Sequence, residues 1–182
     1  MTLIHPARII NASLAERKII AADATEAVFS IGSNPFAFSP GQYIRVTLRG
    51  ASFHDSHGSY RDFSISSAPA DLKQGRISVS FRNSESEFKK TLLAIPMDAS
   101  VQVSGPFGSL VLPKNTTQSI IFVAGGTGIT PFMSMLRHIA AEHLPYRVTL
   151  LYGNKDESST LHLSVKDSHS PSLHAHLCLQ AR

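Results

Sequence analysis

Short segments in which apolar and polar residues alternate make up the first 110 or so residues of the chain. They cover residues 7–14, 18–31, 43–48, 62–66, 76–81 and 101–104. Glycine and proline separate them, and residues 87–95 instead place Phe88, Leu92 and Leu93 on one helical face. Many short strands with turn signals between them are typical of an antiparallel barrel. The pattern therefore predicts a six-stranded antiparallel barrel interrupted by one helix.

From residue 120 the pattern changes to strands that alternate with helices. It predicts strands at 120–124, 147–152 and 174–179, a helix at 131–143 and a further helix at 158–167. This alternation is typical of a doubly wound parallel sheet. The polar stretch around residues 113–118 separates the two patterns. We therefore expect one domain over residues 1–113 and a second, short α/β domain over residues 118–182.

The segment that joins strand 120–124 to helix 131–143 is the most specific feature of the chain. A β-branched run ends in Gly125-Gly126-Thr127-Gly128, and Thr130 and Pro131 open the helix. Glycines let a backbone approach a ligand closely, and a helix N-terminus attracts anions. The segment predicts a turn that holds a nucleotide pyrophosphate. Pro131 takes the place of the third glycine of the strict fingerprint, so a plain strand-to-helix turn stays open as an alternative.

A second candidate motif is Arg61-Asp62-Phe63-Ser64. An arginine fork binds phosphate oxygens in pairs, and an aromatic ring packs well against another ring system. A serine is a small donor and acceptor for ring nitrogens. The alternative is an ordinary alternating strand in which Phe63 is simply buried or exposed by parity.

Together with Pro40-Gly41-Gln42-Tyr43 and residues 77–82, 86–92 and 101–109, these motifs resemble the ferredoxin–NADP reductase superfamily of flavin reductases, over about residues 6–153. The resemblance implies FAD in the barrel, with Ser64 near flavin N5 and the start of helix 87–93 at the flavin pyrophosphate. It implies NAD(P)H on the glycine turn. Phe63 stands where the family usually has tyrosine. The implied cofactor-binding residues are Arg61, Asp62, Phe63, Ser64, Ser80, Phe81, Arg82, Glu87, Phe88, Lys89, Gly125, Gly126, Thr127, Gly128, Thr130 and Pro131.

The resemblance implies an oxidoreductase that passes electrons from NAD(P)H through flavin N5 to an acceptor such as ferredoxin or an oxygenase component. No side chain is assigned an acid–base role, because the flavin carries the chemistry. The second domain is shorter than is usual in the family. Members of the family usually distinguish NADPH from NADH with residues of this domain. The alternative is therefore a flavin-binding electron-transfer module, or a truncated fragment, that does not use NAD(P)H alone.

Composition narrows the remaining possibilities. The 182 residues carry a net charge of +4 without a long basic run, which disfavours nucleic-acid binding. The single cysteine, Cys178, excludes disulfides within the chain and a four-cysteine cluster, and we expect it to pack in a strand. His174 and His176 share a strand face without the companions of a zinc site, so no metal is expected. No apolar run is long enough to span a membrane and no signal peptide is recognisable, which predicts a cytoplasmic protein.

Overall fold

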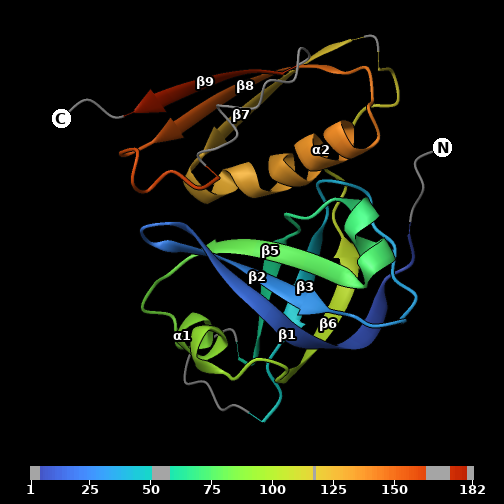
Figure 1. The fold of residues 1–182 in the computed structure, drawn as a ribbon, viewed down its shortest axis with the longest axis vertical. Coiled ribbons are helices and arrows are strands. Elements are labelled where there is room, and N and C mark those ends of the chain that lie inside the picture. Colours follow the sequence, from blue (N-terminus) through green and yellow to red (C-terminus); the bar gives the residue numbers. More distant parts are fainter. Residues whose placement is uncertain (1–4, 51–57, 117, 163–172, 180–182) are drawn as a thin grey trace.

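A computed structural model describes residues 5–50, 58–116, 118–162 and 173–179 (Figure 1). The first part of the chain forms a six-stranded antiparallel sheet with the strand order β4-β3-β6-β1-β2-β5. Its strands are β1 (Arg8–Ala21), β2 (Ala24–Ser30), β3 (Tyr43–Thr47), β4 (Tyr60–Ser64), β5 (Arg76–Arg82) and β6 (Ser100–Phe107). The sheet curls until its edge strands approach each other, and the backbone pairing between these edges in the described part of the chain is the isolated bridge between Ile65 and Val79. The predicted fold class is confirmed, with a barrel that is not fully closed.

The interior of this sheet is filled by the apolar half of each alternating strand. In β5, Ile77, Val79 and Phe81 are buried in the barrel core. Helix α1 (Glu87–Ala94) covers one end with Phe88 and Leu92, which are 0% and 1% exposed. Full burial of each such side chain contributes about 1.5–3 kcal/mol. The core therefore belongs to the first part of the chain alone.

The predicted break between residues 14 and 18 is wrong, because β1 runs without interruption from Arg8 to Ala21. The register between β1 and β2 shifts between Leu14 and Glu16. Such a bulge changes which side chains face inward while the backbone pairing continues. The guanidinium of Arg17 also donates hydrogen bonds to the carbonyls of Leu92 and Ile95 at the end of α1. The polar residues in the middle of β1 therefore have the hydropathy pattern that is typical of a turn.

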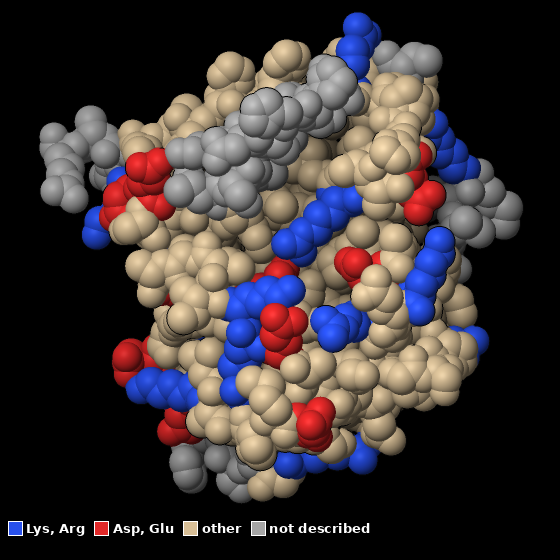
Figure 2. Space-filling model, viewed as in Figure 1, with Lys and Arg blue, Asp and Glu red and all other residues tan. Residues whose placement is uncertain are grey.

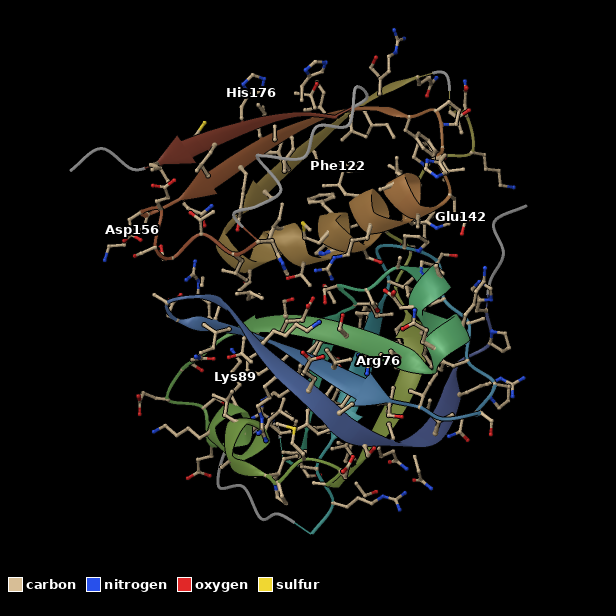
Figure 3. All side chains as sticks on the ribbon, in the orientation of Figure 1. Arg76, Lys89, Phe122, Glu142, Asp156 and His176 are labelled. Atoms are coloured by element: carbon tan, nitrogen blue, oxygen red, sulfur yellow. The ribbon has the colours of Figure 1, made fainter. Side chains whose placement is uncertain are left out.

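The second part of the chain forms a three-stranded parallel sheet with the order β7-β8-β9. The strands are β7 (Ser119–Gly125), β8 (Arg147–Asn154) and β9 (Leu173–Leu179), and the 3-10 turn η2 (Gly126–Ile129) leads into α2 (Thr130–Ala141). Helix α2 lies between the two sheets (Figure 1). The rings of Phe122 and Phe132 stack with centroids 4.5 Å apart, in the layer between β7 and α2 (Figure 3).

Two further predictions on this part need correction. Residues 158–162 form turns rather than the start of a helix, and residues 163–167 lie outside the described residues. Cys178 lies in β9 as expected, but its side chain is exposed rather than packed. Cys178 shares the exposed side of this edge strand with His174 and His176. No described helix is long and apolar enough to cross a membrane.

Candidate cofactor-binding site

A cavity of about 270 Å³ opens where β4 and β5 end and where α1 and α2 begin. Side chains from both parts of the chain line it, although they are up to 69 positions apart in the sequence. All of them are among the residues that the sequence singled out. The lining residues are Arg61, Asp62, Phe63, Ser64, Ser80, Phe81, Arg82, Lys89, Thr127 and Thr130.

The apolar wall of the cavity comes from the barrel core. The ring centroid of Phe63 lies 5.5 Å from that of Phe81 and 6.1 Å from that of Phe88, with tilted planes. Only 7% of Phe63 is exposed, so most of its ring packs inside the barrel. Phe88 is fully buried beneath the cavity wall rather than lining it. The aromatic surface offered to a ligand is therefore an edge of this cluster, with little free ring face.

Two cations lie on the α1 side of the cavity. The Arg61 guanidinium lies 5.1 Å above the ring of Phe88 and donates to the carbonyls of Gly58 and Tyr60, at 3.0 and 2.6 Å. Burial, followed by the charge of Arg61, lowers the pKa of Lys89. The structure shows no ion-pair partner for Lys89 among the described residues, whereas Lys90 pairs with Glu85. An anion in the cavity would therefore be stabilised by this pair.

The start of α1 offers polar groups close to these cations. Ser86 precedes the helix, but its hydroxyl caps no backbone N–H and is buried without a hydrogen-bond partner among the described residues. Glu87 follows in the exposed first turn. A buried hydroxyl without a partner is unusual in a folded protein and points to a group that completes the site.

Two predicted cofactor-binding residues, Asp62 and Arg82, already have partners. Both oxygens of Asp62 accept bonds from Arg45, at 2.7 and 3.0 Å. The Arg82 guanidinium holds the carboxylate of Asp23, at 2.5 and 2.6 Å, and donates to the Ser159 carbonyl at 2.9 Å. Arg82 therefore joins the β1–β2 turn to the turn after β8. Although Arg82 lines the cavity, much of the hydrogen-bonding capacity of its guanidinium is already used by Asp23 and Ser159.

On the opposite side, the glycine turn carries Thr127 and Thr130 into the cavity wall. Gly126 has φ 51°, in the left-handed region that favours glycine. Apart from the chain neighbours of Gly128, no atom of the described residues lies within 4 Å of the position that a Cβ on Gly128 would occupy. Neither packing nor a left-handed φ demands glycine at position 128, so the space beside it is free for a ligand. Gly125 and Pro131 flank the cavity without lining it.

Tyr152 on β8 supports this turn, because its hydroxyl donates to the Gly126 carbonyl at 2.9 Å. Burial raises the pKa of Tyr152. The amide of Asn154 lies near this hydroxyl, yet its nitrogen and oxygen are buried without a hydrogen-bond partner among the described residues. The sequence located this end of β8 but did not identify either role. The sequence signal that could have placed Tyr152 inside the protein is its alternation with Val148 and Leu150, since all three are buried.

A buried polar network joins the two parts of the chain behind the cavity. The Oε1 atom of Glu26 accepts bonds from Ser66 at 2.7 Å and from Arg137 at 2.8 Å. The hydroxyl of Ser80 lies 3.0 Å from Nε2 of His162 and 3.5 Å from Oε1 of Glu26. Burial, and then the charge of Arg137, lowers the pKa of His162 to about 4. Burial acts to raise the pKa of Glu26, but its bond and attraction to Arg137 leave that pKa lowered.

Sequence reasoning missed this network because its members are distant along the chain. A second cavity, of about 490 Å³, lies on its other side, and Lys18, Glu26, Asp71, Arg76 and Arg137 help to line it. Basic and acidic side chains surround the corresponding hollow between the upper and lower parts of the molecule (Figure 2). Among the described residues there is no group of three or more side chains suited to a metal ion.

Comparisons with known proteins agree with this architecture. Residues 122–170 match the family model of the oxidoreductase NAD-binding domain. The chain is 34% identical over 105 residues to an NADPH oxidoreductase of Mycobacterium tuberculosis, covering 56% of this chain and 27% of that protein. It is 27% identical over 158 residues to a ferredoxin–NAD(P)+ reductase component of naphthalene dioxygenase and salicylate hydroxylase systems of a Ralstonia species, covering 85% and 44%.

The fold is also that of solved reductases. The structure superimposes on ferredoxin–NADP+ reductase from Plasmodium falciparum with a TM-score of 0.77 at 17% identity, covering 96% of this chain and 74% of that one. The chain spans less than half the length of the curated relatives that it matches. In its barrel, its parallel sheet and the glycine turn between them, the chain is similar to the ferredoxin–NADP reductase superfamily.

Proposed function

We propose that the protein is an NAD(P)H-dependent flavin oxidoreductase. One part of FAD occupies the 270 Å³ cavity, and NAD(P)H lies on the glycine turn with Thr127 between the two. One observation carries the proposal: cations and an aromatic wall from residues 1–113, and the glycine turn from residues 118–182, meet around a single cavity. We treat these two ranges as the flavin domain and the nucleotide domain.

The residues on the barrel side suit a flavin nucleotide. Arg61, Lys89 and the start of α1 would hold its phosphates, because among the described residues Lys89 has no ion-pair partner and the Ser86 hydroxyl has no hydrogen-bond partner. Ser64 and Ser80 would hydrogen-bond the ring. The cavity is slightly smaller than ordinary ligand pockets, which span about 300–1,000 Å³. It therefore suits one part of FAD. When bound, the flavin supplies the hydride and single-electron chemistry.

The residues on the other side suit a dinucleotide pyrophosphate. The start of α2 presents N–H groups and the positive end of the helix dipole. Gly125 and Gly128 leave room for close approach, and the unpartnered amide of Asn154 lies on the same sheet edge. Ligands of doubly wound sheets bind at this carboxyl edge of the strands.

We further propose that the acceptor is a ferredoxin or an oxygenase component. Relatives include reductase components of dioxygenase systems, which supports this choice. The net charge of +4 suits an acidic electron-transfer partner. We place the protein in the cytoplasm, where metabolism supplies reduced nicotinamide nucleotides.

The test is anaerobic stopped-flow mixing of the FAD-loaded protein with NADH or NADPH, followed at the visible absorbance of the flavin. We expect bleaching, and the ratio of the two rates identifies the donor. Gly128→Val fills the space beside the turn and should slow this reduction at least tenfold, while dithionite still reduces the flavin. Ala140→Val, on α2 but outside this cavity, is the matched control.

A second candidate function follows from the three-stranded parallel sheet, which is small for this fold. In that case the protein is a flavin-binding electron-transfer module that does not use NAD(P)H alone. A bound flavin that dithionite reduces but neither nucleotide reduces would establish this candidate. A protein that binds no flavin would contradict both.

A further inference from the structure

The Ser80 hydroxyl is the point at which the buried network reaches the cofactor cavity. Ser78, Ser80 and Arg82 alternate with the core residues of β5, so they share the face that looks toward α2. Ser80 lines the cavity and is 5% exposed. Its close partner is Nε2 of His162, at 3.0 Å. The nucleotide-binding part of the chain thus contacts the flavin-side wall directly.

The carboxylate of Glu26 is the weaker partner of Ser80. Its Oε1 atom already accepts bonds from Ser66 and Arg137 at 2.7 and 2.8 Å, whereas Ser80 lies at 3.5 Å, the limit for a hydrogen bond. A serine hydroxyl has a single proton. The role of His162, donor or acceptor, therefore decides whether Ser80 can donate elsewhere.

The environment of His162 favours the donor role. The imidazole is 7% exposed and neutral at physiological pH, because burial lowers its pKa to about 4. One ring nitrogen then carries a proton and the other does not. Nε2 faces the Ser80 hydroxyl, and Oε1 of the Glu26 carboxylate, which can only accept, lies 3.5 Å from that hydroxyl. The contact to Glu26 directs the Ser80 proton away from Nε2. The imidazole proton is therefore better placed on Nε2.

We propose that His162 is a positioning residue of the flavin site, donating from Nε2 to Ser80 and thereby leaving the Ser80 hydroxyl proton for an acceptor in the cofactor cavity. Without a ligand, that proton has the long contact to Glu26 as its one acceptor among the described residues, and this contact is easily given up. A donor at the cavity wall stabilises a reduced, electron-rich flavin more than an oxidised one. The inference rests on the proposed flavin site.

The tautomer of His162 is the first test, and it needs no flavin. Long-range ¹H–¹⁵N NMR of protein labelled with ¹⁵N-histidine distinguishes a protonated from a bare ring nitrogen. The His162 signal is assigned by its loss in His162→Gln. We expect a protonated Nε2 and a bare Nδ1 at pH 7. The opposite tautomer, or a doubly protonated ring, would overturn the inference whether or not FAD binds.

The second test is the reduction potential of the bound flavin. His162→Leu removes the donor, and we expect at least a tenfold loss of preference for reduced over oxidised flavin, about 30 mV for a two-electron couple. Ser80→Ala should give a similar shift, and the double variant should add little. His162→Gln shares the left-handed backbone cost at φ 52° but keeps an N–H donor, so it should recover most of the preference.

The control is His176→Leu, on the exposed side of β9 away from α2 (Figure 3). A purely structural role for His162 predicts that all variants lower stability while the potential stays at the wild-type value, and this result would overturn the inference. Wild-type protein that shows the expected tautomer but binds no FAD would contradict the proposed function instead.

Discussion

The two sheets of this molecule differ in how they bury their apolar side chains. The six-stranded sheet curls around its own core, in which Leu14, Phe29 and Ile44 are fully buried. The parallel sheet packs one face against α2, and its other face leaves Ile121 and Val123 65% and 70% exposed. The barrel is therefore stabilised by its own strands, whereas the parallel sheet depends on α2 and on contacts with the barrel. The difference predicts which changes affect the whole molecule and which affect one part.

A cavity in the barrel core should have the largest effect. Phe29→Ala removes a ring that is 0% exposed at the centre of the core, and we expect a loss of about 3–5 kcal/mol in the free energy of unfolding. Denaturant unfolding followed by far-UV circular dichroism measures this loss. A smaller loss than that of Phe122→Ala in the parallel sheet would contradict the comparison.

Acid should weaken the contact between the two parts through His162. An unfolded imidazole titrates near pH 6.5, whereas burial lowers the folded pKa to about 4. Between these values the unfolded chain binds a proton that the folded chain does not, so stability falls as the pH falls, by about 3 kcal/mol in total. Unfolding at pH 7, 5.5 and 4.5 measures the slope. The same slope in His162→Gln would assign it to other groups.

Lys89 should matter for the flavin more than its neighbour on α1. Lys89→Gln removes a partly buried cation from the cavity, and we expect roughly tenfold weaker FAD binding, about 1.4 kcal/mol. Lys90→Gln is the matched control, because Lys90 is exposed and pairs with Glu85. Fluorescence titration with FAD measures both. Because the pKa of Lys89 is lowered, binding to the wild type should weaken at a lower alkaline pH than an ordinary lysine would require.

The exposed face of the parallel sheet should give the smallest effect. Ile121→Thr changes a side chain that is 65% exposed, and we expect a change within about 0.5 kcal/mol. Phe122→Leu, one residue along and 5% exposed, should cost more. A large loss for Ile121→Thr would show that another part of the protein or a partner covers this face.

The local parts of the fold and of the site were readable from the sequence. The strand–glycine–helix segment and the motif at residues 61–64 lie within continuous stretches, so residue type and spacing reveal them. The continuity of β1 was not readable, because the bulge after Leu14 shifts the alternation. Nor was the pairing of Arg82 with Asp23, or of Glu26 with Arg137. Such contacts depend on which strands become neighbours in space, and periodicity within one segment carries no record of that.

The position of β6 has a consequence for how the chain folds. β6 is the last barrel strand in sequence, yet it pairs with β3 on one side and with β1 on the other, where Arg8 lies opposite Gly105. During synthesis, β1 and β3 each keep an unpaired edge until residues 100–107 have emerged. Unpaired edges recruit other strands, and long-range pairing is slow. A nascent chain is thus most prone to aggregation just before its sixth strand arrives, and chaperone binding should be strongest there.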